Sequence, residues 1–238
     1  MLVEDEGIVL RSWPLGEADG IFSILTRSHG KIRVAGKGIK KNRLMRAALS
    51  PLTRGRFICW EGKGELGKIS SASALSPFGL ALSSTYPSYL AACLMAEVAD
   101  KLLETSQGEE ESYLLLWGAL SALAKRRMEP WKIVLSFELR ILACAGWSPA
   151  PFGCAACGRE GDFLSFSPAR GGWVCERCAC GREVRYSEAQ KAQFCALLCG
   201  DWGKVGERDP AVEGLVRGWV NYYLDRNLNS EKVIREKI

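Results

Sequence analysis

The hydrophobic pattern of this chain changes near residue 86, and the change limits the folds that the chain can adopt. Before it lie five short segments that are rich in β-branched and aromatic residues and are bounded by Gly, Pro, Asn or Ser, a pattern that predicts strands. The predicted strands cover residues 7–13, 20–26, 31–36, 53–60 and 65–70. Five short strands in about 75 residues predict a small barrel, and the OB-fold is the commonest barrel of five strands.

Periodicity alone does not settle the type of barrel, and it leaves an SH3-like barrel as the alternative. Gly62-Lys63-Gly64 lies between the last two predicted strands and suggests a hairpin connection. Among the aromatic residues of these strands, Phe22, Phe57 and Trp60 are candidates for stacking on nucleic-acid bases. Core packing is the more common role for such residues.

Beyond that change the apolar residues recur at three- and four-residue spacing, which predicts amphipathic helices. The segment from Tyr113 to Ala124 is apolar on most sides and predicts a buried central helix. Three acids, Glu109 to Glu111, open this helix, where they favour the positive end of its dipole. The spacing is interrupted over residues 146–186, which are rich in Gly, Pro and Cys, and it returns at residues 187–199 and 212–223.

The predicted fold class is therefore α+β, with two domains. An N-terminal five-stranded OB-fold barrel covers residues 1–80, and an α-helical domain covers residues 81–238. The helical domain carries an inserted segment over residues 146–186, which we call the cysteine-rich segment. The chain is long enough for two such domains, since a domain commonly has about 100–200 residues.

Four cysteines of this segment have the spacing of a structural zinc site. Cys154 and Cys157 form one Cys-x2-Cys pair, and Cys175 and Cys178 form a second pair after 17 intervening residues. In zinc ribbons and knuckles of this spacing, four thiolates complete a tetrahedral shell and leave no open position for water. We therefore predict one structural Zn²⁺ bound by these four sulfurs. Cys180 could replace Cys178 as the fourth ligand, but the two-residue spacing favours Cys178.

The chain between the two cysteine pairs has the pattern of a short hairpin. Residues 163–166 and 173–174 are the expected arms around Gly171-Gly172. Two redox-active pairs or simple core thiols are the alternatives to zinc, but neither pair is predicted at a strand-to-helix junction, where a thioredoxin-like site would lie. The other cysteines lie in apolar contexts and are predicted to pack in the core: Cys59, Cys93, Cys144, Cys195 and Cys199.

The positive charge of the chain is concentrated in the predicted barrel. The formal net charge is +5, but residues 1–80 carry 13 Lys and Arg against 7 Asp and Glu, whereas residues 81–238 carry 19 against 20. Between Arg27 and Trp60 there are ten basic residues and no acid, which implies a polyanionic partner rather than an ordinary solvated face. We predict that DNA phosphates are bound by eight of them: Arg27, Lys31, Arg33, Lys37, Lys40, Lys41, Arg43 and Arg46.

Several classes of protein are disfavoured. Acids stand near the N-terminus where a signal peptide would be basic and apolar, and no apolar stretch reaches the roughly 20 residues of a membrane helix. We therefore expect a cytoplasmic protein with no membrane partner and with thiols instead of disulfides. The only histidine, His29, is expected in a loop or turn, and its isolation excludes zincins and zinc deaminases. Gly30 to Lys37 is one residue too long for a phosphate-binding loop, and we expect no enzymatic turnover.

An ordered set of short motifs resembles the RecO family of bacterial recombination mediators. In chain order the set is Gly7-Ile8-Val9-Leu10, Gly16-Glu17-Ala18-Asp19, Leu25-Thr26, Gly30-Lys31, Ala35-Gly36-Lys37-Gly38, Leu49-Ser50-Pro51-Leu52, the four-cysteine insertion, a C-terminal helix over residues 216–227 and a tail over residues 230–236. The resemblance covers nearly the whole chain. In one departure from the family, Asn42-Arg43-Leu44 stands where a Ser usually follows the basic loop.

The resemblance implies a DNA-repair and recombination mediator of the RecF pathway, with no catalytic residues. RecO proteins bind single- and double-stranded DNA through an OB-fold, anneal complementary strands, and help to load recombinase onto strands coated by single-strand DNA-binding protein. They work with RecR, and their helical domain receives the C-terminal tail of the single-strand DNA-binding protein. Such a protein is expected in the cytoplasm with the nucleoid. Some members lack the zinc cysteines, which suggests that the metal stabilises the fold.

Two other functions remain as alternatives. An RNA- or ribosome-associated OB-fold protein with a structural zinc would use the same basic barrel, and only RNA offers a 2′-hydroxyl to distinguish the two ligands. A zinc-dependent enzyme is disfavoured because four cysteine ligands close the metal site to substrate.

Overall fold

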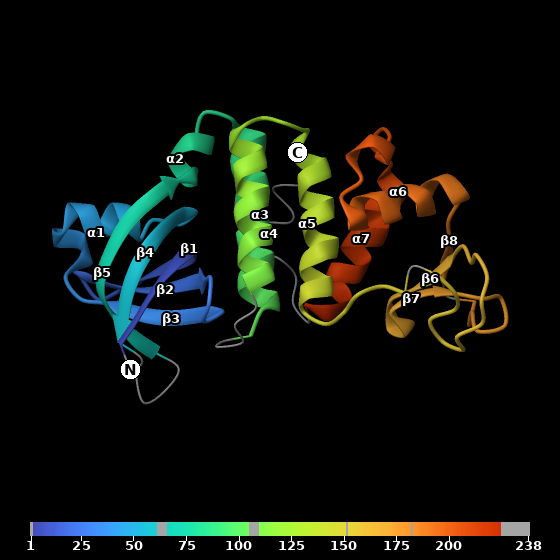
Figure 1. The fold of residues 1–238 in the computed structure, drawn as a ribbon, viewed down its shortest axis with the longest axis horizontal. Coiled ribbons are helices and arrows are strands. Elements are labelled where there is room, and N and C mark those ends of the chain that lie inside the picture. Colours follow the sequence, from blue (N-terminus) through green and yellow to red (C-terminus); the bar gives the residue numbers. More distant parts are fainter. Residues whose placement is uncertain (1, 61–65, 105–109, 151, 182, 225–238) are drawn as a thin grey trace. The chain divides into compact units, whose positions relative to one another are not determined.

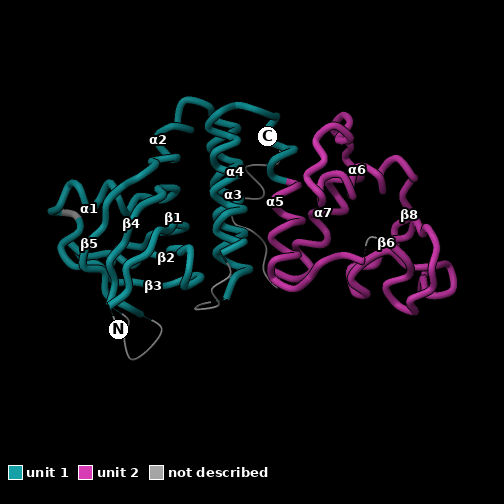
Figure 2. Tube along the Cα trace, viewed as in Figure 1, with its two compact units in different colours: residues 1–134, 228–238 teal, residues 135–227 magenta. Residues whose placement is uncertain are grey.

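The computed structural model describes residues 2–60, 66–104, 110–150, 152–181 and 183–224 (Figure 1). An N-terminal barrel is followed by helices and by a small second sheet. By the density of their contacts the residues form two compact units, the first running to Val134 and the second beginning at Leu135, within one helix (Figure 2). The predicted domain boundary at residues 80 and 81 falls three residues after the end of the last barrel strand at Pro77, and it stays a prediction.

Five strands close the barrel in the order β1-β2-β3-β5-β4. Their bounds are β1 (Leu2–Leu15), β2 (Asp19–Thr26), β3 (Lys31–Gly36), β4 (Thr53–Trp60) and β5 (Leu66–Pro77). The pair β3–β5 is parallel, and the other pairs are antiparallel. This closed Greek-key order is that of an OB-fold rather than of an SH3-like barrel, so the predicted α+β fold with an OB-fold barrel is confirmed.

Two of the strands are longer than predicted. β1 begins at Leu2 and β5 runs to Pro77, although residues 71–77 contain no β-branched residue. Pairing with β4 along its whole length keeps this part of β5 extended, since a strand paired on the sheet does not depend on its own propensity. The hairpin connection expected at Gly62-Lys63-Gly64 lies outside the described residues.

The interior of the barrel is aliphatic with two aromatic rings. Its buried residues are Val9, Phe22, Ile24, Val34, Ile39, Leu49, Phe57, Cys59 and Ile69. Ile39 begins the 3-10 turn η1 (Ile39–Lys41), and the short helix α1 (Arg43–Ala48) follows it. A Cβ on Gly36 would lie 2.6 Å from Ile39 Cγ1, so glycine is needed where this turn folds back onto the barrel.

Helices α2 (Phe78–Leu82), α3 (Tyr86–Leu102) and α4 (Glu110–Ala124) complete the described part of the first unit together with the start of α5 (Pro130–Cys144). Ser23 Oγ on β2 donates to Asp100 Oδ1 on α3 at 2.6 Å, and Tyr113 on α4 accepts from Arg54 Nε at 2.9 Å. These bonds hold α3 and α4 against the barrel. The first turn of α4 carries Glu110 and Glu111, as predicted. The helix is not buried on all sides, because Leu114 is 41% exposed.

The second unit joins the end of α5 to α6 (Glu188–Cys199), α7 (Pro210–Tyr223) and a sheet of order β7-β6-β8. The strands are β6 (Ser165–Ser167), β7 (Gly172–Val174) and β8 (Val184–Arg185), and β6 and β7 form the predicted hairpin around the 3-10 turn η2 (Pro168–Arg170). A second 3-10 turn, η3 (Trp202–Lys204), connects the two helices.

The ends of α6 and α7 follow local sequence signals. Ser187 Oγ accepts from Gln190 N at 3.2 Å while Gln190 Oε1 accepts from Ser187 N at 3.0 Å, a capping box that starts α6. Pro210 opens α7 behind the cap of Asp209, as proline suits a first helical position. Residues 225–227 of the predicted C-terminal helix and the predicted tail lie outside the described residues.

Within the described ranges, no helix combines the length and the apolar character needed to cross a bilayer.

Candidate metal centre and nucleic-acid interface

The sulfurs of Cys154, Cys157, Cys175 and Cys178 all lie within 4.8 Å of one another. The Sγ atoms of Cys157 and Cys175 are 3.9 Å apart. Four thiolates around one Zn²⁺ at about 2.3 Å each would have sulfurs separated by roughly 3.8 Å. The cluster therefore has the donor set and the spacing of a closed tetrahedral zinc shell.

Local turns bring the two pairs together. In the first pair, Cys154 N donates to Arg159 O at 2.9 Å, and Gly158 N donates to Cys154 O at 2.8 Å. Gly158 has a φ of 70°, the left-handed conformation that this tight turn needs. In the second pair, Cys178 N donates back to Cys175 O at 2.9 Å. Each pair thus turns its two sulfurs toward the same point.

The electrostatics of the cluster favour a cation. Burial acts to raise the pKa of the Cys154 thiol, but hydrogen bonds from the backbone of Cys175, Ala156 and Cys157 outweigh it and lower that pKa to about 6. Hydrogen bonds with Cys157 and Cys175 raise the pKa of Cys178 to about 12. One thiolate is therefore favoured while a further deprotonation is opposed by the negative charge already present. A bound divalent cation would remove that opposition.

Cys180 does not join the cluster. Its side chain is exposed, its N–H donates to Glu183 Oε2 at 2.8 Å, and its Sγ lies 3.8 Å from the carbonyl of Cys178. The geometry thus selects Cys178 over Cys180. Among the other cysteines, Cys59 is buried as predicted, Cys93, Cys144 and Cys195 are half-buried, and Cys199 is exposed, so its predicted core packing is wrong. It lies in the last turn of α6, where the helix ends against solvent.

The hairpin beside the cluster packs on α6 and α7 through aromatic rings. Trp173 is fully buried, and its ring lies edge-on to Phe166 at 5.2 Å and to Phe194 at 5.7 Å. Phe166 lies 5.0 Å from Trp219 of α7. The buried ammonium of Lys191 adds an ion pair with Asp162 and lies 5.1 Å from the ring of Trp173. The hairpin thus links the cluster to the helical core.

Five of the predicted DNA-binding cations are exposed, and we call them together the basic surface. Arg33 lies on β3, and the others follow it along the η1 turn and α1. None of the five pairs with a carboxylate of the described residues. The basic surface consists of Arg33, Lys37, Lys41, Arg43 and Arg46. Lys40 lies in the same turn, but its side chain is outside the described part of the chain.

The remaining cations of the acid-free stretch meet acids from other parts of the chain. Arg27 pairs with Glu110 of α4 at 2.6 Å, and the Arg54 guanidinium pairs with Glu6 of β1. Lys31 is only 5% exposed, and its ammonium donates to the backbone carbonyl of Asp100. Burial lowers the pKa of Lys31. Arg27 and Lys31 therefore serve the packing of helices on the barrel and are not part of the basic surface.

Asn42, the residue that departs from the family pattern, begins α1. Its side chain accepts a hydrogen bond from Met45 N at 3.1 Å. Asn and Ser are comparable N-cap residues, so this departure keeps the helix start that a Ser would also provide. His29 lies in the bend after β2, as predicted, with its Nδ1 2.8 Å from Asp5 Oδ2.

Of the three aromatic candidates for base stacking, only one is accessible. Phe22 is 5% exposed and Phe57 is 1% exposed, and both belong to the barrel core. Trp60, at the end of β4, is 51% exposed.

Lys68 on β5 is an exposed cation that the sequence reasoning missed, because it lies beyond the acid-free stretch. Its pairing opposite Trp60 is visible only in the register of the barrel strands.

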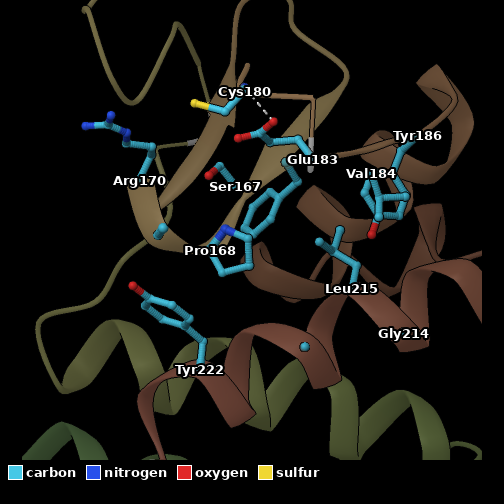
Figure 3. A pocket seen from close by; sticks show the side chains of 13 residues that line it. Ser167, Pro168, Arg170, Cys180, Glu183, Val184, Tyr186, Gly214, Leu215 and Tyr222 are labelled. Atoms are coloured by element: carbon cyan, nitrogen blue, oxygen red, sulfur yellow. Dashed lines mark hydrogen bonds between the residues drawn. The ribbon is translucent and has the colours of Figure 1, made fainter. Parts of the chain in front are cut away.

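The second unit has a pocket of about 600 Å³ between the cysteine-rich segment and α7. Pro168, Leu215 and Tyr222 form much of its apolar wall (Figure 3). Arg170 extends outward at the rim, and Glu183 accepts the hydrogen bond from Cys180 N on the opposite side (Figure 3). The pocket thus combines apolar side chains with one cation, Arg170, and one acid, Glu183, in its lining.

Two family descriptions together match almost the entire chain. Recombination protein O N terminal matches residues 1–78, and Recombination protein O C terminal matches residues 83–232. The chain belongs to the RecO family. Membership supports a role in DNA repair and recombination, and the N-terminal match ends one residue after the last barrel strand.

Curated relatives agree over their full length. A DNA repair protein RecO of Bifidobacterium longum is 39% identical over 238 residues, which cover 98% of each chain. The proteins of the same name from Thermobifida fusca and Streptomyces avermitilis are 36% and 34% identical and cover 98% and 99% of both chains. The RecO resemblance inferred from the short motifs is confirmed.

Proposed function

We propose that this RecO-family protein is a recombination mediator that binds single- and double-stranded DNA, anneals complementary strands and helps to load recombinase onto strands coated by single-strand DNA-binding protein. The observation that carries the proposal is the basic surface: five exposed cations on an OB-fold barrel, with no acid from the described residues pairing with them. Such a surface suits phosphates of any sequence. The protein acts by binding, without catalytic turnover, in the cytoplasm with the nucleoid.

Strand annealing tests this proposal directly. Wild-type protein is expected to accelerate the pairing of complementary strands both bare and coated with single-strand DNA-binding protein. Substituting Lys37, Lys40 and Lys41 with Ala should weaken binding to all DNA sequences alike and reduce the salt slope by up to about 3, since each lost phosphate contact lowers it by about 1. Unchanged affinity in this variant would refute the assignment of the surface.

A matched triple variant provides the control. Lys125, Arg127 and Lys204 are exposed outside the barrel strands, and their replacement with Ala removes the same charge. This variant should keep the wild-type affinity and salt slope. Tighter binding to an RNA strand than to the DNA strand of the same sequence would support the RNA-associated alternative instead, because only RNA offers a 2′-hydroxyl.

We also propose that Cys154, Cys157, Cys175 and Cys178 bind one structural Zn²⁺. Their four sulfurs fit a closed shell, and zinc in such a shell stabilises the fold without taking part in chemistry. Mass spectrometry of the reduced native protein should find one equivalent of zinc. A stoichiometry well below one would refute the site.

The protein partners proposed for this chain are RecR and the C-terminal tail of single-strand DNA-binding protein. We assign the tail to the pocket beside α7, whose apolar wall and rim cation suit a peptide end. Tyr222 lines the pocket and is 53% exposed. Its replacement with Ala should weaken the binding of a labelled tail peptide. Tyr86, 51% exposed in the first unit, is the matched control. Equal affinity of both variants would exclude this pocket.

A further inference from the structure

A groove of about 600 Å³ lies on the barrel, between the turn that follows β3 and the outer side of β5. Lys37 stands on one wall and Lys68 on the other, and the residues that line the groove include no acid. Asp19 is the nearby carboxylate, and its Oδ1 is engaged by Gly38 N at 2.8 Å. The groove thus has a positive character set by Lys37 in the bend after β3 and Lys68 on β5.

The floor of the groove is polar because β5 carries a bulge. Ile69 pairs with Cys59 and Ser71 pairs with Ile58, so Ser70 is the extra residue between two pairs. A bulge changes the alternation of side chains, and both Ser70 and Ser71 are consequently exposed. Two adjacent hydroxyls therefore lie between the lysines, where they can donate to phosphate oxygens.

The strand register places Trp60 beside one of the lysines that line the groove. Trp60 pairs with Lys68 of β5 on one side and with Leu2 of β1 on the other. Side chains directly opposite each other on paired strands lie about 4.5–5.5 Å apart at Cβ. Trp60 is 51% exposed, and both of its neighbours are exposed as well. A half-exposed indole thus stands next to the lysine that lines the groove.

We propose that this groove and Trp60 form a binding path for single-stranded nucleic acid, with backbone phosphates on Lys37 and Lys68 and an unpaired base stacked on the Trp60 indole. The inference rests on the proposed function and adds to it a determinant of strand type. Bases in a duplex are stacked on each other, so their faces do not reach a surface ring, whereas the faces of a single strand do. Charge complementarity favours a nucleic acid, because the only charged residues among those that line the groove are two lysines, with two serine hydroxyls beside the apolar side chains of the lining.

The test compares a single strand and a duplex of equal length. Trp60→Ala should weaken single-strand binding by a factor between about 5 and 150, the range for loss of one base-stacking contact. Duplex affinity and the salt slope should stay at the wild-type value, because the phosphate contacts remain. Trp60→Phe, which keeps an aromatic face, should restore most of the single-strand affinity.

Matched controls separate this effect from a general loss of structure. Trp202→Ala removes a tryptophan that is 37% exposed in the second unit and should leave both affinities unchanged. Lys68→Ala should lower the salt slope for the single strand by about 1, while Lys125→Ala should not. Zinc content and thermal midpoint are measured for every variant to confirm a native fold.

The outcomes distinguish a failure of the proposed function from a failure of the single-strand path alone. If wild-type protein binds neither DNA, the proposed function itself fails. If it binds both, and Trp60→Ala either leaves single-strand affinity unchanged or weakens both forms equally, the single-strand path is overturned. Trp60→Ala that keeps DNA affinity but loses a protein partner would assign the surface to that partner and would also overturn the path.

Discussion

The barrel and the cysteine-rich segment differ in what holds them together. The barrel strands have between 6 and 14 residues and close on themselves around a core of nine buried side chains. The strands of the segment have 2 or 3 residues, and the buried cluster among its cysteines consists of Cys154, Val174 and Cys175. A unit with so little apolar surface to bury generally needs a metal or disulfides to remain folded.

The comparison separates two kinds of stabilisation in one chain. The barrel depends on hydrophobic burial and a closed hydrogen-bond ladder, both supplied by its own residues. The cysteine-rich segment depends on its thiolates and on the contact of Trp173 and Phe166 with the aromatic rings of α6 and α7. Loss of metal should therefore unfold the cysteine-rich segment and leave the barrel folded.

Removing the metal should have the largest effect. Cys175→Ser should abolish zinc binding, and structural zinc contributes an apparent binding free energy of about 10–16 kcal/mol in comparable sites. Hydrogen exchange followed by mass spectrometry should show lost protection over residues 152–186 and retained protection over residues 7–60. Cys180→Ser is the matched control and should keep zinc. Equal loss of protection in the barrel would refute the independence of the two regions.

Opening a cavity in the barrel core should destabilise the barrel and leave the zinc site intact. Phe57 is 1% exposed, and its replacement with Ala should lower the free energy of unfolding by about 3–5 kcal/mol. Chemical denaturation measures the loss, and mass spectrometry of the native protein should still find zinc bound. Loss of zinc in this variant would show that the segment relies on an intact barrel.

A buried acid in the second unit makes stability depend on pH. Glu138 on α5 is 2% exposed, and burial raises its pKa to about 8, although Arg217 opposes the shift and Glu213 adds to it. The folded protein therefore holds a proton that the unfolded chain releases above about pH 4.5. The free energy of unfolding should fall as the pH rises from about 4.5 to 8, by at most about 5 kcal/mol, and then level off.

Glu138→Gln removes this titration. The variant should be more stable than wild type at pH 8 and similar to it near pH 4, as measured by denaturation at each pH. Glu111, an exposed acid on α4, is the control position, and Glu111→Gln should leave the pH profile unchanged. If the free energies of unfolding of Glu138→Gln and wild type changed with pH in parallel, Glu138 would not be the group responsible for the pH dependence.

The smallest effects should distinguish a packing lysine from a DNA-binding one. Lys31→Met leaves the Asp100 carbonyl without its donor and should lower stability by about 1–3 kcal/mol while the DNA salt slope stays unchanged. Lys37→Ala should change stability by no more than about 0.5 kcal/mol and lower the salt slope by about 1. Similar salt slopes in the two variants would mean that the burial of Lys31 does not exclude it from binding DNA.

Much of the architecture follows from local signals. β2, β3 and β4 lie within one residue of their predicted positions, because they contain β-branched and aromatic residues and turn residues stand near their ends. The Cys-x2-Cys turns and the hairpin between them also form where the sequence places them. Helices α1 and α2 were missed, since with six and five residues they are too short to show a helical period.

The sequence by itself determined the barrel, the helices, the spacing of the four cysteines and the membership of the RecO family, because each of these depends on residues that are close together in the chain. Only the tertiary structure decided which cations reach solvent. Lys31 is covered by α3 and Arg27 meets an acid 83 positions away, while Lys68 and Trp60 come together through strand pairing. Exposure and pairing depend on elements that are distant in sequence, and a stretch without acids in the chain need not remain without acids in space.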